Sequence, residues 1–228
     1  MKPLSPKQRA AIDALSLLPE SGIIGLGTGS TAAFFIDGVA EAIRGGKRLK
    51  CVVTSEQSRR QALKLSIPLL DNVGPWDIDL CVDGADEVSG ELDLIKGGGG
   101  CHWREKIVNQ ASRFNVIIAD ETKISPKLGR LAMVPVEVAE FGHAATGQLL
   151  RQFGEATLRF EGDVPWRTDG GNLIYDIKSG EIADPGALDR AIHNIPGVVE
   201  TGLFVNRANL IIVGSDSGIR RVEKHPRS

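Results

Sequence analysis

Short apolar runs alternate with amphipathic stretches through the first half of the chain. The apolar runs of strand length lie at 22–26, 48–53, 78–82 and 115–119. The stretches with helical spacing of apolar residues lie at 7–18, 30–43, 55–65 and 103–111. Brief apolar runs bounded by turn residues are typical of buried strands, and a 3.6-residue period is typical of surface helices. The alternation predicts an α/β fold with a doubly wound, Rossmann-like, mainly parallel sheet.

The pattern changes near Gly129. Further on, strand-like runs lie at 133–138, 156–160 and 173–177, and helical stretches at 144–153 and 186–193. This order predicts a smaller inserted α+β domain, ferredoxin-like, with antiparallel strands. The apolar run at 210–213 is expected to return to the first sheet. We therefore expect residues 1–129 plus 207–228 to form the Rossmann-like catalytic domain and residues 130–206 the small domain, with a charged, solvated tail from Arg220 on.

Composition narrows the function classes. The 228 residues carry a net charge of −2, which does not indicate a basic nucleic-acid surface. An uninterrupted run of eighteen apolar residues is absent from the sequence, so we expect no membrane span. The three cysteines have neither CxxC nor zinc spacing. Together with a first segment that lacks the apolar core of a signal peptide, they predict a cytoplasmic protein with reduced thiols and no bound metal.

A glycine-rich turn follows the first strand and opens the second helix. It reads Gly25-Leu26-Gly27-Thr28-Gly29-Ser30-Thr31. Backbone N–H groups at such a helix start favour an anion, and hydroxyls add donors. Ser30 replaces the third glycine of the dinucleotide fingerprint, and the P-loop lysine is absent, so a phosphomonoester fits better than a nucleotide. The alternative is a plain βα turn. Candidate phosphate ligands are Thr28, Gly29, Ser30 and Thr31, with Lys7 and Lys123 as charge partners.

Candidate acid–base residues follow the later strands. Asp83-Gly84-Ala85-Asp86 lies at a carboxyl strand end, where open α/β sheets bind ligands. Two carboxylates on one turn can divide acid and base roles, although Asp and Gly also favour polar turns for backbone reasons. Lys96 precedes four glycines, and Glu105 follows on the next helix. Taken singly, each is more often structural; the set on successive strand ends indicates chemistry.

A set of this kind suits the removal of a proton from a carbon atom beside a carbonyl group. This reaction needs a base that reaches the C–H bond, a donor for the developing enediolate, and a handle remote from the reacting carbons. Carboxylates, a lysine with backbone N–H groups, and the phosphate site meet these three needs. Neither a cofactor nor a metal enters this scheme.

These motifs resemble the type A ribose-5-phosphate isomerases over nearly the whole chain. The matching segments, in order, are GLGTGSTA at 25–32, TSEQS at 54–58, DGADEV at 83–88, LIKGGGG at 94–100, REKIV at 104–108 and DETK at 120–123, with weaker matches VPVEV at 134–138 and IPGVVETGLF at 195–204. The set is specific, whereas no single segment is.

The resemblance implies interconversion of D-ribose 5-phosphate and D-ribulose 5-phosphate in the non-oxidative pentose phosphate pathway, without a cofactor. It implies that Glu105 is the proton-transferring base and that Asp83, Asp86 and Lys96 assist ring opening and handle the C1 and C2 oxygens. The remaining positions are implied to bind substrate: Thr28, Gly29, Ser30, Thr31, Gly84, Ala85, Gly97, Gly98, Gly99, Lys123 and Lys7. It also implies a homodimer or homotetramer.

One segment departs from the family pattern. Cys101-His102-Trp103 stands where small or aliphatic residues are expected. Cys101 is a candidate oxidation-sensitive thiol, although packing or solvent exposure explains all three residues more simply.

Two rival functions stay open. A non-catalytic phosphosugar-sensing module would carry a separate DNA-binding head, and about two dozen residues before the phosphate loop are too few for one. A nucleotide-dependent oxidoreductase is disfavoured by Ser30.

Overall fold

The structure is a computed structural model that describes residues 3–223. It divides into two compact units. Within the described residues, the first contains 3–84, 104–122 and 207–223, and the second contains 85–103 and 123–206. The two-domain boundaries expected from the sequence stay a prediction. The compact units differ from the expected domains at 85–103 and 123–129. In the second unit, Leu94–Ile95 pairs with Leu203–Phe204, and Ile124 forms a bridge with Val88.

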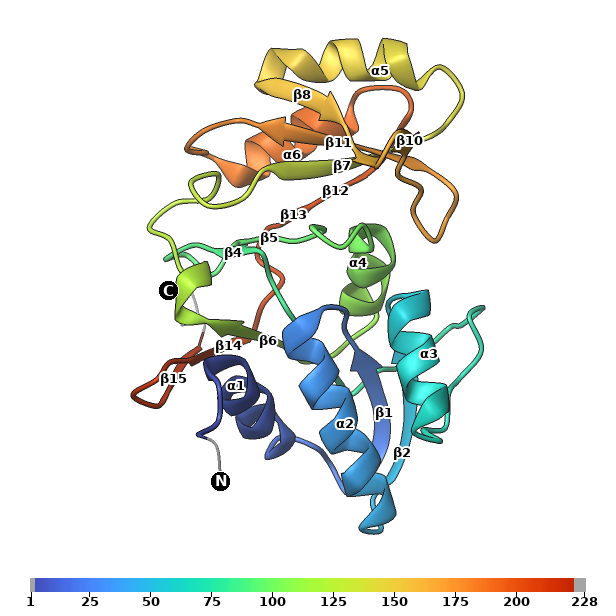
Figure 1. The fold of residues 1–228 in the computed structure, drawn as a ribbon, viewed down its shortest axis with the longest axis vertical. Coiled ribbons are helices and arrows are strands. Elements are labelled where there is room, and N and C mark those ends of the chain that lie inside the picture. The colour runs from blue at the N-terminus through green and yellow to red at the C-terminus, as the bar shows by residue number, and fades with distance from the viewer. Residues whose placement is uncertain (1–2, 224–228) are drawn as a thin grey trace. The chain divides into compact units, whose positions relative to one another are not determined.

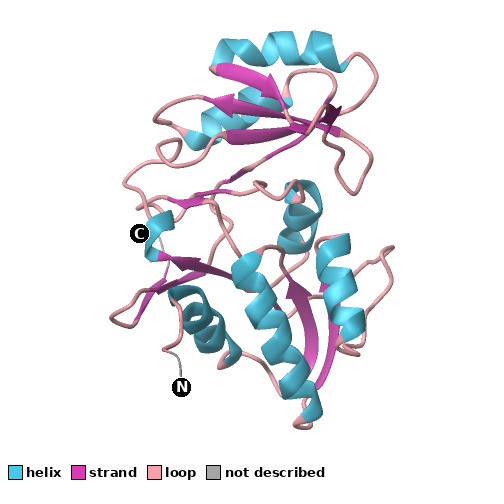
Figure 2. Ribbon diagram, viewed as in Figure 1, coloured by secondary structure: helices cyan, strands magenta, loops and turns pink. Residues whose placement is uncertain are grey.

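The first unit holds the large sheet. Its elements are α1 (Pro6–Leu15), β1 (Ser21–Leu26), α2 (Ser30–Arg44), β2 (Arg48–Val53), α3 (Glu56–Lys64), β3 (Leu80–Asp83), most of α4 (His102–Gln110), β6 (Asn115–Asp120), β14 (Leu210–Gly214) and β15 (Ile219–Glu223). The strand order is β15-β14-β6-β3-β1-β2, and every pair except β14–β15 is parallel. The chain leaves β1 toward β2 and leaves β3 toward β6, so the strand order reverses between β1 and β3. Figure 1 labels β1, β2, β6, β14 and β15 of this sheet, and Figure 2 draws the strands in magenta. Ligands bind at such a switch point in doubly wound sheets.

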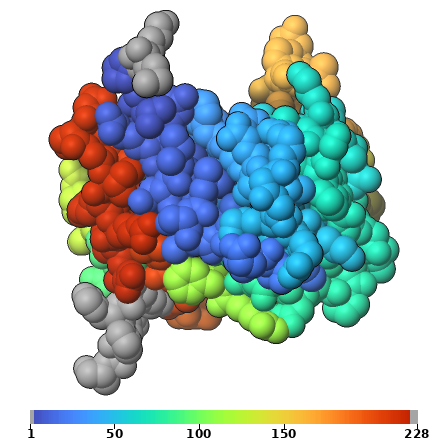
Figure 3. Space-filling view, turned by 90° about the horizontal axis from the view of Figure 1, so that it is seen from below, coloured from blue at the N-terminus to red at the C-terminus, as the bar shows by residue number. Residues whose placement is uncertain are grey.

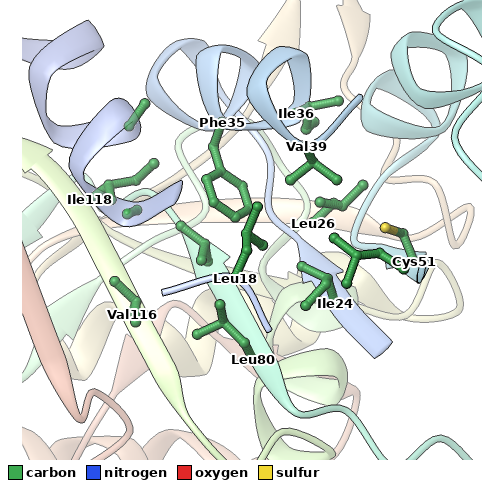
Figure 4. Close-up of a cluster of buried hydrophobic side chains, with 14 of the residues drawn as sticks. Leu18, Ile24, Leu26, Phe35, Ile36, Val39, Cys51, Leu80, Val116 and Ile118 are labelled. Carbon is green, nitrogen blue, oxygen red and sulfur yellow. The ribbon is translucent and has the colours of Figure 1, made fainter. Parts of the chain in front are cut away.

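Helix α2 shows how sequence produces this packing. Its buried residues include Ala32, Phe35, Ile36, Val39 and Ala40. The spacing of three and four residues places them on one face of the helix. That face packs on β1, β3 and β6 in the main core, where Phe35 lies among Leu18, Leu26 and Ile118 (Figure 4). The opposite face of the sheet has a smaller cluster formed by Val52, Ile78, Cys81 and Val108 of α4.

The C-terminal strand corrects one expectation. Residues from Arg220 on were expected to be a solvated tail, yet Ile219–Glu223 pairs antiparallel with β14 as an edge strand. Its alternation is weak and most of its residues stay exposed, which is why the sequence pattern missed it. Figure 3 shows this hairpin beside α1, which in turn lies beside α2. The remaining tail lies outside the described residues.

The second unit is built on a separate antiparallel sheet. Its elements are β4 (Glu87–Val88), β5 (Leu94–Ile95), β7 (Val134–Val138), α5 (His143–Leu150), β8 (Glu155–Leu158), β9 (Phe160–Glu161), β10 (Val164–Pro165), β11 (Leu173–Lys178), α6 (Pro185–His193), β12 (Val198–Thr201) and β13 (Leu203–Phe204), with short 3-10 helices at Glu121–Lys123 and Arg151–Phe153. The sheet order β12-β7-β11-β8 and the element order β7-α5-β8-β11-α6-β12 are ferredoxin-like. A three-stranded sheet, β13-β5-β4, completes the unit. The predicted α/β fold with a smaller α+β part is confirmed. Among residues 3–223, no helix has the length and apolarity needed to cross a membrane.

Candidate active site

The loop between β1 and α2 leads into a helix start that has no side-chain cap. Gly29 is the N-cap of α2 with φ of 111°, and no side chain caps the helix there. A side chain at Gly29 would meet nothing within 4 Å, so the loop faces open space. The ammonium of Lys7 donates to Ser30 Oγ at 2.9 Å. Uncapped N–H groups, the helix dipole and a lysine together favour a bound anion.

The Thr28 side chain points the other way, into a cluster of hydroxyls. Its Oγ1 lies 2.7 Å from Thr54 Oγ1, 2.8 Å from Ser55 Oγ and 3.2 Å from Ser58 Oγ. Ser58 also donates to the Gly27 carbonyl at 2.7 Å. Residues 54–58 (TSEQS) therefore hold this loop in place through hydrogen bonds. A substrate role for the Thr28 hydroxyl stays a prediction, and these contacts show that it already braces the loop.

Asp83 joins the two predicted loops of the first unit. Its Oδ1 accepts the Thr28 N–H at 2.9 Å and the Gly84 N–H at 2.7 Å. The side chain is 4% exposed. Hydrogen bonds to a charged group are typically worth about 1.5–3 kcal/mol, so Asp83 fixes the spacing between the loop after β1 and the turn after β3.

Glu105 is buried, not a surface residue. It lies in the first turn of α4 and is 5% exposed. Val108, one turn later on the same helix face, packs so closely on β1 that a Cβ at Gly25 would come within 2.9 Å of it. Because α4 leads into parallel strand β6, its first turn lies toward the carboxyl edge of the sheet. Arg104 beside it pairs with Glu56 at 2.9 Å.

The second unit carries the other predicted residues. Asp86 Oδ2 accepts the Gly98 N–H at 2.7 Å. Lys96 is 3% exposed, and its Nζ lies 5.3 Å from the centre of the Phe204 ring. Its backbone N–H donates to Gly202 at 2.9 Å. Lys123 ends the short helix after β6. Ala85 follows Gly84 directly. The glycine loop, Gly97–Gly100, leads within a few residues into α4.

The predicted residues thus fall into two sets, one in each compact unit. Lys7, the 27–31 loop, Asp83, Gly84 and Glu105 belong to the first unit, while Ala85, Asp86, Lys96, the 97–99 loop and Lys123 belong to the second. Their predicted roles remain predictions and are taken up in the proposal below.

Sequence reasoning missed several supporting side chains. Glu87, fully buried, accepts the N–H groups of Gly129, Arg130 and Ala132 at 2.9 to 3.1 Å. Arg159, which directly follows β8, donates hydrogen bonds to the carbonyls of Gly97 and Gly98 in the glycine loop. Glu87 was visible only as part of the DGADEV match, and Arg159 lies in no quoted motif. Such partners are far apart in sequence, so no local spacing identifies them.

The departing segment packs within the second unit. His102 is fully buried, with Nε2 3.4 Å from the Glu200 carbonyl oxygen. A Cβ at Gly170 would lie 2.7 Å from the Trp103 ring. These contacts support the packing explanation for both side chains.

Cysteine reactivity should follow burial. None of the three cysteines, all of which lie within residues 3–223, forms a disulfide. Burial raises the pKa of the Cys51 thiol to about 12, and Cys81 is buried as well. Cys101 is half-buried, and its Sγ donates to the Gly99 carbonyl at 3.4 Å. We expect a thiol reagent at pH 8 to label Cys101 well before the other two, as peptide mapping would establish; earlier labelling of Cys51 would contradict it.

One group of side chains has the proximity needed for a cation. Ligand atoms of Asp189, His193 and Glu200 lie within 4.8 Å of one another. His193 Nε2 is 2.8 Å from Glu200 Oε1, and Nδ1 is 2.9 Å from the Asp189 carbonyl oxygen. Hydrogen bonds to Asp189 and then to Glu200 raise the pKa of His193 to about 10. A proton on the imidazole therefore satisfies the two carboxylates at neutral pH.

This raised pKa predicts a pH-dependent stability. A folded-state pKa above the unfolded value near 6.5 gives stabilisation that is complete below pH 6.5 and is lost as pH rises toward 10. We expect the difference in Tm between wild type and His193→Gln to shrink over that range. Thermal unfolding of both proteins at pH 6, 8 and 10 measures it, and a constant difference would contradict the prediction.

The fold and these loops define a doubly wound α/β protein with a helix start suited to an anion and with carboxylates at the carboxyl edge of its large sheet. The family model described as ribose 5-phosphate isomerase A (phosphoriboisomerase A) matches residues 50–218. The chain therefore belongs to the ribose 5-phosphate isomerase A family, as its motifs predicted.

Individual relatives agree. Ribose-5-phosphate isomerase A of Gloeobacter violaceus is 47% identical over 215 residues, covering 93% of this chain and 94% of the relative. The structure of ribose 5-phosphate isomerase A from Methanocaldococcus jannaschii aligns with a TM-score of 0.90 at 38% identity, covering 96% and 98% of the two chains. A D-ribose-5-phosphate isomerase in complex with phospho-erythronic acid aligns with a TM-score of 0.92 at 37% identity, covering 95% and 97%. These comparisons give no support to the sensing-module alternative.

Proposed function

We propose that this protein is an aldose–ketose isomerase that interconverts D-ribose 5-phosphate and D-ribulose 5-phosphate. The observation that carries the proposal is the uncapped start of α2, with Lys7 at Ser30, in the same unit as a buried carboxylate at Glu105. An anion-binding loop and a shielded base are the two parts that a phosphosugar isomerase needs first. Family membership and the phosphosugar-acid complex of a relative support the same substrate.

The proposed chemistry is a proton transfer between two carbons. The Glu105 carboxylate takes the C2 proton of the open-chain aldose. The electron pair of that C–H bond forms the C1–C2 double bond, and the carbonyl pair moves onto O1 to give an enediolate. Glu105 then returns the proton to C1 while a proton passes from O2 to O1. Substrate and product contain the same atoms and electrons, so neither an oxidant nor a reductant is required.

The remaining residues are proposed to stabilise charge and open the ring. Lys96 is buried, with its ammonium near the Phe204 ring, and away from bulk water an ammonium stabilises a developing oxyanion more strongly than it does in water. Asp83 and Asp86 are proposed to assist proton movement on the ring and carbonyl oxygens. Gly84, Ala85 and Gly97–Gly99 are proposed to contact the sugar through their backbones.

The phosphate group is proposed to act as the handle. The 28–31 loop, Lys7 and Lys123 would hold it, remote from the reacting carbons. Binding energy realised there can be used to orient C1 and C2. The step would belong to the non-oxidative pentose phosphate pathway.

A direct assay tests the proposal. Purified, chelator-treated protein is incubated with ribose 5-phosphate, and ketose formation is followed. We expect rapid conversion without an added cofactor. If no ketose forms but ribose 5-phosphate still raises the Tm, the protein is a phosphosugar sensor and not an isomerase.

Assembly and location complete the proposal. We expect a homodimer or homotetramer, which light scattering coupled to size-exclusion chromatography would measure, and no nucleic-acid partner. A cytoplasmic location is supported by three thiols without a disulfide.

A further inference from the structure

Arg159 is held between two strands of the second unit and reaches a loop more than sixty residues earlier. It lies between β8 and β9, where its N–H donates to Ile174 at 2.8 Å and its carbonyl accepts from Trp166 at 2.9 Å. Its guanidinium donates to both carboxylate oxygens of Asp176 on β11. The two side chains are 16% and 12% exposed. This bidentate pair fixes the guanidinium in one orientation.

The free edge of that guanidinium lies on the glycine loop. Arg159 Nη1 donates to the Gly97 carbonyl at 3.0 Å and to the Gly98 carbonyl at 3.1 Å. The Gly100 N–H also donates to Gly97, at 2.9 Å, which closes a turn. Gly97 has φ of 104°. Four successive glycines lose much conformational entropy on ordering and have no side chains to hold them, so backbone contacts must hold this loop.

One peptide group connects Arg159 to Asp86. The Gly97 carbonyl and the Gly98 N–H belong to the same amide. The carbonyl end accepts from Arg159, while the N–H end donates to Asp86 Oδ2 at 2.7 Å. A cation at one end and a carboxylate at the other polarise the amide in the same sense, and hydrogen bonds in series strengthen each other. The orientation of Asp86 therefore depends on how Arg159 holds this peptide.

We propose that Arg159, oriented by Asp176, is a positioning residue that fixes the Gly97–Gly98 peptide and, through it, the Asp86 carboxylate. The proposal rests on the proposed isomerase function, in which Asp86 acts on the sugar oxygens. Lysine cannot replace arginine here, because a single ammonium lacks the planar fork that binds a carboxylate in pairs while donating to carbonyls on its other edge.

The test compares Arg159→Lys with Arg167→Lys. Arg167 makes the same kinds of contact, to the Glu140 carboxylate and to the Gly171 carbonyl at 2.9 Å, but it does not contact the glycine loop. We expect Arg159→Lys to lower kcat about 100-fold, the order that follows from a misplaced catalytic group. KM for ribose 5-phosphate should change little, because the proposed phosphate handle is elsewhere. Arg167→Lys should retain wild-type kcat and KM.

Hydrogen exchange of the peptide that spans 94–101 tests the same point without catalysis. Arg159→Lys should speed amide exchange there, whereas Arg167→Lys should not. Asp176→Asn should reproduce both effects, and the double variant should be no worse than Arg159→Lys, because the two residues act as one unit.

The outcomes separate the two proposals. If wild type does not isomerise the sugar, the proposed function fails, while the exchange measurement still decides whether Arg159 orders the loop. Unchanged exchange in Arg159→Lys overturns the positioning role. So does an equal loss of kcat in Arg159→Lys and Arg167→Lys, or a loss confined to KM.

Discussion

Replacing Glu105 with glutamine should lower kcat by about 10²–10⁴-fold, the range over which general base catalysis contributes. Glutamine preserves the shape of the side chain but cannot accept the C2 proton. The position is 5% exposed, so bulk water has little access to take over as the base. Because the proposed phosphate handle is unchanged, KM should change much less than kcat. Initial rates of ketose formation over a range of ribose 5-phosphate concentrations measure both quantities.

The matched control is Glu41→Gln on the exposed side of α2. It makes the same chemical change at a solvated site and should leave kcat, KM and Tm at wild-type values. Proton NMR in deuterium oxide adds a second readout, since wild type should exchange the transferred hydrogen and Glu105→Gln should not. A Glu105→Gln enzyme with near wild-type turnover would remove Glu105 from the reaction and move the search for the base to Asp83 or Asp86.

The large sheet could be predicted because its information is local. The strand at 48–53 matches β2 over its full length, and α2 extends only one residue beyond the predicted 30–43. The alternation of these elements is enough to specify parallel pairing. The strands that were missed are β4, β5, β9, β10, β12, β13 and β15, and five of these have two residues. Such strands are defined by distant partners, as β13 is by β5, and carry almost no periodicity of their own.

The candidate site divides in the same way. The glycine-rich turn before α2 was identifiable from its position after a strand. The absence of a side-chain cap at Gly29 agrees with the prediction of an anion site there. The inward orientation of Thr28 was not, because three of its hydroxyl partners lie 26 to 30 positions away. Arg159 was missed for the same reason. Sequence patterns thus located the residues proposed to face a ligand better than the residues that hold them in place.

Gly27 offers a steric test of the first unit. Its φ is not in the left-handed region, so its backbone conformation suits any residue. A Cβ at this position would overlap both the Asp83 carboxylate and the Asp83 backbone, whose Cα lies 2.5 Å away. Backbone of an adjacent strand cannot move as a flexible side chain can. Gly27→Ala should therefore push Asp83 away from Thr28 and separate the 27–31 loop from Asp83 and Gly84.

Two effects should follow from that displacement. Overpacking of this kind typically costs about 1–3 kcal/mol of unfolding free energy. Activity should fall further, with kcat/KM reduced about 100-fold, because a shift of about 1 Å in a catalytic group has that effect. Denaturant unfolding and initial-rate kinetics measure the two losses separately.

Gly45→Ala is the matched control, since it is the same change at the C-terminal end of α2. Its φ is −78°, and a Cβ there would make ordinary contacts at 3.4 Å. It should leave both stability and activity close to wild type. If Gly27→Ala behaved like Gly45→Ala, the close contact between β1 and Asp83 would not control the geometry of the site. If Gly27→Ala lost activity far beyond its loss of stability, the Asp83 carboxylate would be doing more than holding two loops together, as expected of a group that also acts on the substrate.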